Sequence, residues 1–205
     1  MKWNNKIPAI NLVTTMQKTY VLLTNDVETT SIWLNTLRDE TGLKVLREGM
    51  PALLDIYEEF NIKSTFYFTG YIANLFPDVV KMIISHGHEV ASHGKSHIRE
   101  NGFDIMPLDK QIRHLDYTKK LLEDISGQKV ISFRAPALRV NDDTPRALIE
   151  TGHLIDSSIA AQRFDFFMSF GGVKKLRWLT APRLPYRTSP DSLFKKGHGP
   201  LVEVP

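Results

Sequence analysis

Predicted strands and predicted helices alternate through most of this 205-residue chain, and this alternation constrains the fold more than any other feature. Short apolar or β-branched runs predict strands at residues 20–24, 64–69, 89–92, 130–133, 154–155 and 201–205. Between them, apolar residues recur at helical spacing over 43–60, 77–87, 108–125 and 145–152. The pattern predicts an α/β fold in which helices surround a parallel sheet or a (β/α) barrel.

Two regions follow the pattern less closely. Pro51 marks a break in the 43–60 helix or a late start to its regular part, and Asn61 fits its C-terminal end. Residues 160–200 contain turns, several Pro and Gly, and no clear amphipathic period, so no helix or strand is predicted there. Residues 1–18 are polar and broken by Pro8, and we expect an irregular lead-in before a single domain over 19–205.

Composition narrows the class of protein. With 42% hydrophobic and 24% charged residues, the chain is expected to be globular rather than disordered. The net charge is +3, but Lys and Arg are scattered, which disfavours nucleic-acid binding. The chain has no Cys, which excludes disulfides and thiolate metal sites. No stretch approaches the length of apolar sequence that spans a membrane, and no secretory signal is seen, so we expect a cytoplasmic protein.

Polar, chemically capable residues follow four of the predicted strands. Asp26 and Glu28 come after the first strand, His93 after the third, Arg134 after the fourth and Asp156 after the fifth. In (β/α) barrels the active residues lie where the strands end. Polar residues distributed at random would rarely take these positions, so the pattern predicts a site at this end of the sheet.

The residue types at these strand ends suit a metal ion. His93 and His97 are four residues apart, and a single backbone turn would place both rings on one side. Two imidazoles and one carboxylate make a site for zinc or another first-row divalent metal. Asp26 and Glu28 point the same way on extended backbone, so one could be a ligand and the other a general base, with Arg134 holding the base ionised. The alternative is that these are ordinary surface residues.

Four motifs resemble those of the polysaccharide deacetylase family, the fourth family of carbohydrate esterases. They are Thr24–Glu28, His93–His97, Arg134–Pro136 and Asp156–Ser158, in the family's order, over about residues 20–160. The resemblance implies an incomplete or distorted (β/α) barrel. It also implies metal-dependent removal of an N- or O-linked acetyl group from a sugar, with a divalent metal that is often zinc.

Carried over by position, the resemblance assigns a role to seven residues. The metal ligands it implies are Glu28, His93 and His97. Asp26 would be the general base and Arg134 would position it. The backbone amide of Ala137 would help to stabilise the oxyanion, and Asp156 would be a supporting group.

The chain departs from the family pattern in three places. Val27 stands where the commonest first motif has a second Asp, which leaves open whether Asp26 or Glu28 is the ligand. Asn25 replaces the usual aromatic residue. The fifth motif, a late His that acts as general acid, is not evident, because His198 precedes the last predicted strand. Since the chain stops inside that strand, we expect a domain truncated at its C-terminus.

Three functions remain as hypotheses. The first is a metal-dependent deacetylase of glycan biosynthesis that acts on an acetylated sugar, a glycan, or a lipid- or nucleotide-linked sugar. The second is a deformylase or cyclic-amide hydrolase on the same scaffold. The third is a catalytically silent protein that binds a metal or a sugar. The sequence does not identify the sugar, the metal or the oligomeric state.

Overall fold

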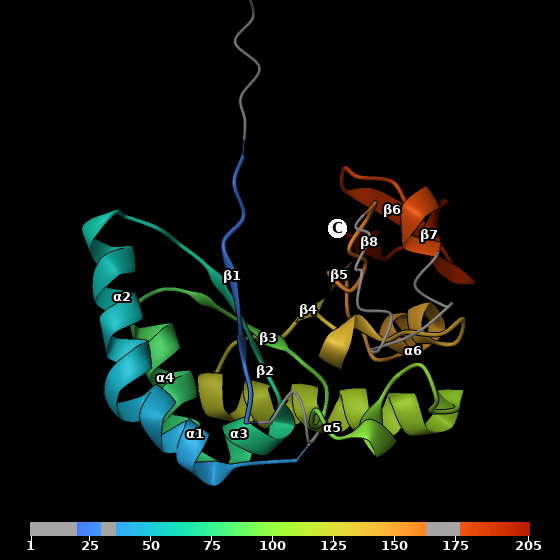
Figure 1. Ribbon diagram of the computed structural model, residues 1–205. Coiled ribbons are helices and arrows are strands. Elements are labelled where there is room, and N and C mark those ends of the chain that lie inside the picture. The colour runs from blue at the N-terminus through green and yellow to red at the C-terminus, as the bar shows by residue number, and fades with distance from the viewer. Residues whose placement is uncertain (1–19, 30–35, 163–176) are drawn as a thin grey trace, which may run out of the picture.

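The strands form one mixed sheet that does not close on itself (Figure 1). The structure, a computed structural model, describes residues 20–29, 36–162 and 177–205, so the predicted lead-in over 1–18 lies outside the described residues. The strands are β1 (Thr24–Val27), β2 (Thr65–Phe68), β3 (Glu89–Ser92), β4 (Ser132–Phe133), β5 (Ile155–Asp156), β6 (Tyr186–Ser189), β7 (Ser192–Lys196) and β8 (Val202–Glu203). Within the described residues their order is β1-β2-β3-β4-β5-β8-β6-β7.

The strand directions agree with a (β/α) barrel that is left open. Strands β1 to β5 and β8 pair in parallel, whereas β6 is antiparallel to both β8 and β7. In the part of the chain that the structure describes, β1 and β7 are the two ends of the sheet and do not pair with each other. The incomplete (β/α) barrel predicted from the sequence is therefore confirmed.

Helices connect successive parallel strands and lie along the outside of the sheet (Figure 1). The α-helices are α1 (Asp39–Lys44), α2 (Met50–Glu59), α3 (Gly70–Leu75), α4 (Pro77–Ser85), α5 (Leu108–Ser126) and α6 (Thr144–Glu150). A π-helical turn, η1 (Val45–Gly49), joins α1 to α2, and short 3₁₀ turns form η2 (Arg99–Asn101) and η3 (Pro136–Leu138). Among the described residues, no helix has both the length and the apolar composition needed to cross a membrane.

The hydrophobic core fills the space between the sheet and these helices. Because side chains alternate along a strand, Phe66 and Phe68 of β2 both point to the helix side, where they pack with Leu54 of α2. A second cluster joins Phe133 of β4 to Leu148 of α6. The opposite face of the sheet carries both polar and apolar residues, among them Asp26, Tyr67 and Ile155.

Several predicted boundaries hold. Strand β3 has the predicted bounds, and α5 differs by one residue at its C-terminal end. The regular helix α2 begins at Met50 with Pro51 in its first turn, as expected from a late start. Asn61 ends the segment in the left-handed region with φ of +51°.

The first strand was predicted wrongly. It spans Thr24–Val27 rather than 20–24, and the side chains of Tyr20, Val21 and Leu22 are 67–79% exposed. The apolar run suggested a strand buried on both faces. Yet β1 is an edge strand, and its registered pairing with β2 begins only at Thr24, opposite Thr65. The position of the neighbouring strand, not local hydrophobicity, sets the start of β1.

Several elements were missed, among them helix α3 and the β6–β7 hairpin. Helix α3 starts directly after β2, where the hydroxyl of Thr69 accepts a hydrogen bond from the amide of Ile72 at 3.4 Å. The hairpin of β6 and β7 lies within the region where no element was predicted. Its residues are mixed polar and apolar, and their strand conformation depends on pairing with each other and with β8.

His153 is a buried histidine on the helix side of the sheet, just before β5. It is 1% exposed, and its Nδ1 lies 2.9 Å from the hydroxyl of Thr151. Burial lowers the pKa of His153 to about 3, and the nearby Lys119 ammonium adds to the effect. The folded protein therefore keeps this imidazole neutral.

We expect this residue to make the protein less stable in acid. The unfolded chain takes up the proton near the ordinary pKa of 6.5, so the stabilisation is complete above that pH and is lost as the pH falls toward 3. The slope reaches about 1.4 kcal/mol per pH unit. Urea denaturation at about pH 7 and about pH 5 should show a smaller pH dependence for His153→Gln than for the parent. Equal pH dependences would contradict the assignment.

Candidate metal centre

The segment after β3 turns sharply and brings two imidazoles to one place. The amide of His93 donates to the carbonyl of Phe68 at 2.7 Å, which ties the start of the turn to β2. Gly94 has φ of +67°, and a Cβ there would lie 3.3 Å from Pro136, so the turn requires glycine. The rings of His93 and His97 end with their centroids 5.9 Å apart, on the same side as predicted.

Glu28 meets both rings from the end of β1. Its Oε2 lies 3.3 Å from the Nε2 of His93 and 3.3 Å from the Nε2 of His97. The three ligand atoms lie within 4.8 Å of one another. The structure thus brings together the three residues that the sequence predicted as metal ligands.

The hydrogen bonds behind the rings decide which atoms face the centre. His93 Nδ1 lies 2.8 Å from the carbonyl oxygen of Arg134, which can only accept, so Nδ1 carries the hydrogen and neutral Nε2 presents a lone pair. The amide of Ala137 donates to His97 Nε2 at 3.0 Å, so this nitrogen is unprotonated, and a cation would take its lone pair in place of that hydrogen bond. Glu28 Oε2 is buried and has no hydrogen-bond donor as long as both imidazoles are neutral. Three electron-pair donors facing one another fit a bound cation.

The protonation equilibria of the metal-free site agree with this arrangement. Burial lowers the pKa of His93, but the hydrogen bond to Glu28 and the charges of Asp26 and Glu28 outweigh it and raise the pKa overall. Burial lowers the pKa of His97. The pKa of Glu28 is lowered because the two histidines outweigh the effect of its burial. A proton on His93 can therefore occupy the place between ring and carboxylate, and a cation would displace it.

Asp26 is placed differently from Glu28. Its Oδ1 accepts a hydrogen bond from Arg134 Nη1 at 2.9 Å, and its Oδ2 lies 3.8 Å from His93 Nε2. One oxygen is thus held by a guanidinium while the other lies beside the His93 ring. Asp26 and Glu28, which the sequence could not tell apart, have different partners in the fold.

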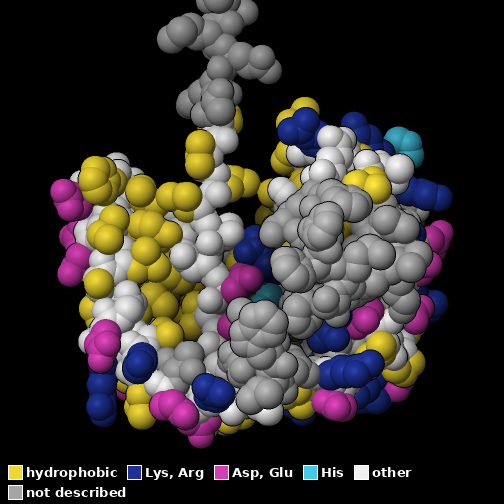
Figure 2. Space-filling model, in the orientation of Figure 1, with side chains coloured by type: hydrophobic (Ala, Val, Ile, Leu, Met, Phe, Trp, Pro, Cys, Tyr) yellow, Lys and Arg dark blue, Asp and Glu magenta, His cyan; other side chains and the backbone are white. Residues whose placement is uncertain are grey.

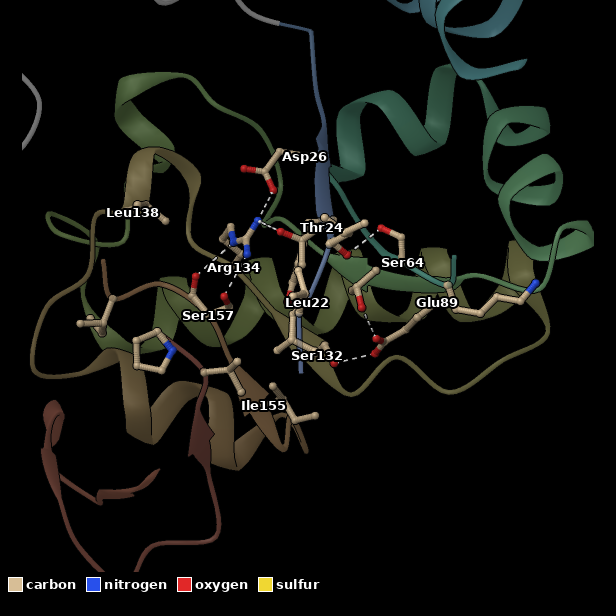
Figure 3. Close-up of a pocket in the computed structure, with 18 of the residues that line it drawn as sticks. Leu22, Thr24, Asp26, Ser64, Glu89, Ser132, Arg134, Leu138, Ile155 and Ser157 are labelled. Carbon is tan, nitrogen blue, oxygen red and sulfur yellow. Dashed lines mark hydrogen bonds and ion pairs between the residues drawn. The ribbon is translucent and has the colours of Figure 1, made fainter. Parts of the chain in front are cut away.

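Arg134 is held on several sides, as Figure 3 shows. Its Nη1 also donates to the hydroxyl of Thr24 at 3.1 Å. Its Nε donates to the carbonyl of Ser157 at 3.1 Å, and its Nη2 to the hydroxyl of Ser157 at 2.9 Å. The guanidinium lies 4.2 Å above the ring of Tyr67, which projects from β2 on the face opposite Phe66 and Phe68.

The backbone at Ala137 is bent toward the site. Ala137 and Leu138 have φ of +53° and +54°, in the left-handed region that L-residues rarely adopt. Such conformations cost about 1–3 kcal/mol each and concentrate at functional sites. Here the bend directs the Ala137 amide at His97 Nε2, and therefore at the centre.

Asp156 does not reach the three ligand atoms directly. It is fully buried in β5, and its Oδ1 accepts a hydrogen bond from the hydroxyl of Ser158 at 2.6 Å. That hydroxyl in turn accepts a hydrogen bond from the amide of Ala135 at 2.9 Å.

His198 is exposed in the loop after β7. This agrees with the prediction that it is not the late histidine of the family pattern.

A cavity of about 710 Å³ runs along the inner face of the sheet; Asp26 and Arg134 line it, whereas Glu28, His93 and His97 do not. Its walls combine the polar side chains of Asp26 and Arg134 with apolar ones such as Leu138 and Ile159. Figure 2 shows acidic, basic and histidine side chains gathered in the hollow between two parts of the surface. The volume lies in the range of small-molecule sites.

The comparison with known families identifies the chain. Residues 15–154 match the family described as polysaccharide deacetylase. The chain belongs to the polysaccharide deacetylase family. The open sheet with its outer helices is the distorted (β/α) barrel of such deacetylases, as the resemblance of the four motifs implied.

Individual relatives agree with this membership. The chain is 32% identical over 152 residues to a peptidoglycan deacetylase-like protein of Gibberella zeae, covering 68% of this chain and 44% of that protein. It is 27% identical over 146 residues to the peptidoglycan deacetylase of Helicobacter pylori, covering 68% and 49%. The crystal structure of a candidate polysaccharide deacetylase from Mycobacterium smegmatis superposes with a TM-score of 0.62 at 26% identity, covering 89% and 56%. The chain therefore spans about half the length of these relatives.

Sequence reasoning missed some of the residues that support the centre. Tyr67 was not singled out in the predicted strand 64–69, yet it is buried and stacks under Arg134. Glu203 of β8 was not considered, although an acid inside the apolar run 201–205 was a usable signal. Its pairing partner in β5 is Asp156.

Proposed function

We propose that this chain is a hydrolase that removes an acetyl group from an N-acetylated sugar with the help of a divalent metal. One observation supports it above the others: the lone pairs of Glu28, His93 and His97 converge beside an Asp26 that Arg134 holds. In this arrangement Glu28 and the two histidines are available to hold a metal, and Asp26 is available to accept a proton. Zinc is the metal we propose, because two imidazoles and one carboxylate form a common zinc site with an open position.

The residues divide the work according to their contacts. Glu28, His93 and His97 would hold the cation, which when bound would lower the pKa of a water molecule and polarise the acetyl carbonyl. Asp26 Oδ2 lies beside the His93 ring and would accept the proton of the attacking water. Arg134 orients Asp26 through its charge-assisted hydrogen bond.

Ala137 supplies a further group at the same place. Its amide already points to the centre, where it would donate to the oxygen that becomes negative when the acetyl carbonyl is attacked. Asp156 supports the arrangement from behind through Ser158 and Ala135. The roles that the family resemblance implied are thus compatible with the positions of these residues.

For the substrate we propose an N-acetylglucosamine-containing glycan. One relative is named peptidoglycan deacetylase and another peptidoglycan deacetylase-like protein, and both are longer than this chain. The cavity has room for sugar units next to Asp26 and Arg134. Lipid- or nucleotide-linked sugars and O-acetylated sugars are the alternatives. A cytoplasmic location is a separate proposal, which cell fractionation tests.

Acetate release from chitin oligosaccharides and from peptidoglycan tests this function. We expect no release from protein stripped of metal and restored release after one equivalent of Zn²⁺, because the water is activated only in the loaded site. The same assay should include N-formylated sugars and a cyclic amide, so that each competing hydrolase gives its own product. Bound zinc without release from any of these compounds would contradict an enzyme and favour a binding protein.

A further inference from the structure

Two carboxyl groups face each other in the buried sheet behind Arg134. Asp156 of β5 and Glu203 of β8 are parallel pairing partners, so their side chains project from adjacent positions on the same face. Both residues are 0% exposed. Asp156 Oδ1 accepts from the hydroxyl of Ser158 at 2.6 Å, and Glu203 Oε1 accepts from the amide of Ile159 at 3.0 Å.

The second oxygen of each group has no donor from the rest of the protein. Asp156 Oδ2 and Glu203 Oε2 are both buried without a hydrogen-bond partner when both groups are treated as carboxylates. Two such anions side by side would repel and would leave two buried acceptors unsatisfied. One proton between them removes both problems, since one group then donates to the other.

The surroundings decide which group keeps the proton. Burial and the charge of Asp156 raise the pKa of Glu203 well above its ordinary value. Burial also raises the pKa of Asp156, but hydrogen bonds from Glu203 and Ser158 and the charge of Arg134 oppose the rise. Glu203 is therefore the neutral donor and Asp156 the anion that accepts.

Asp156 is connected to Arg134 by two short routes. Its neighbour Ser157 accepts two hydrogen bonds from Arg134: the carbonyl accepts one from Nε and the hydroxyl accepts one from Nη2. Ser158 donates to Asp156 and accepts the amide of Ala135, which follows Arg134 in the chain. The orientation of the Asp156 carboxylate therefore affects Ser157, which holds the Arg134 side chain, and Ser158, which holds the backbone directly after Arg134.

We propose that Glu203 is a positioning residue: its neutral carboxyl group donates the hydrogen bond that fixes Asp156 and, through Ser157 and Ser158, fixes Arg134 beside Asp26. The inference rests on the proposed function for its catalytic consequence. Its structural part stands by itself, because the orientation of Arg134 can be measured without metal or substrate. Glu203 does not touch the reacting atoms, so it acts through the residues that it orients.

Three variants separate this role from a merely structural one. Glu203→Gln keeps a donor toward Asp156 and an acceptor toward Ile159 in nearly the same shape, whereas Glu203→Met keeps the length but removes both. Thr188→Val is the matched control. It removes a buried hydroxyl of neighbouring β6, which contacts the carbonyl of Leu201 and not the Asp156 network.

The first readout is the exchange rate of the Arg134 Nε–H with water, measured by ¹⁵N NMR on the metal-free protein. That hydrogen is protected by the carbonyl of Ser157. We expect Glu203→Met to speed its exchange at least about tenfold, whereas Glu203→Gln and Thr188→Val leave it within about twofold. The second readout is deacetylation of a chitin oligosaccharide by the zinc-loaded protein, where Glu203→Met should lower kcat about tenfold or more with KM nearly unchanged, and Glu203→Gln should restore kcat.

The outcomes distinguish the possibilities. A Glu203→Met protein that melts at a lower temperature but keeps the Arg134 exchange rate of the parent would overturn the positioning role. A Glu203→Gln protein as impaired as Glu203→Met would overturn the neutral-donor role. If Glu203→Met does not fold, Ser158→Ala breaks the next link toward Ala135, and unchanged Arg134 exchange in that variant would equally refute the proposal. Altered exchange in a protein without any deacetylase activity would support the positioning role and contradict the proposed function.

Discussion

Asp26→Asn is expected to lower kcat for deacetylation by about 10²–10⁴-fold while changing zinc affinity by less than about tenfold. Asp26 Oδ2 lies beside the His93 ring, 3.8 Å from its Nε2, and Asp26 Oδ1 is held by Arg134 at 2.9 Å. An amide of the same shape cannot accept the proton of the attacking water, but it leaves the ligands in place. Steady-state kinetics on a chitin oligosaccharide and zinc titration against a chromophoric chelator measure the two effects separately.

Glu28→Gln is the matched control, because it makes the same change of carboxylate to amide two residues away. Glu28 Oε2 is the atom 3.3 Å from both Nε2 nitrogens, so this variant should lose zinc affinity together with turnover. The opposite pattern, in which Glu28→Gln keeps zinc and Asp26→Asn loses it, would show that the two acids have exchanged roles.

His93→Ala is expected to weaken zinc binding by more than about 100-fold, which is the upper range for loss of an outer-shell partner of a metal ligand. The substitution removes one of three convergent donors and leaves Glu28 Oε2, already without a hydrogen-bond donor, facing a void. Turnover at limiting zinc should fall at least as far. Competition with a chelator of known affinity measures the dissociation constant directly.

Two further substitutions make this test specific. His97→Ala removes the partner that the Ala137 amide contacts, and it should weaken zinc binding similarly. His198→Ala removes an exposed histidine of the loop after β7, and zinc affinity should be unchanged. Parent protein that binds no zinc, or a His198→Ala effect as large as that of His93→Ala, would contradict the proposed centre.

Much of the architecture was predictable because it depends on short-range patterns. Apolar residues at helical spacing located α5, and the run at 89–92 located β3. Their alternation was enough to predict a parallel sheet or a (β/α) barrel, and the family resemblance added that the barrel is incomplete. The same periodicity failed for β1, since it cannot show whether Tyr20–Leu22 have a strand beside them.

The residues of the candidate site were predictable as a set. The predicted ligands Glu28, His93 and His97 converge, and Asp26 and Arg134 form the expected ion pair. Their roles were less predictable from the sequence, because Asp26 and Glu28 have the same chemistry and the same local setting. Glu203 was missed because its importance comes from pairing with Asp156, 47 positions earlier in the chain (203 − 156).

The sequence by itself determined which chemical groups this protein can bring to a site, and that strand ends would carry them. Only the tertiary structure decided which side chains direct their lone pairs to one place. The carbonyl that orients His93 comes from Arg134, 41 residues away, and the guanidinium that holds Asp26 comes from 108 residues away. Hydrogen-bond direction and burial depend on such distant partners, whereas hydrophobic periodicity is a property of neighbouring residues.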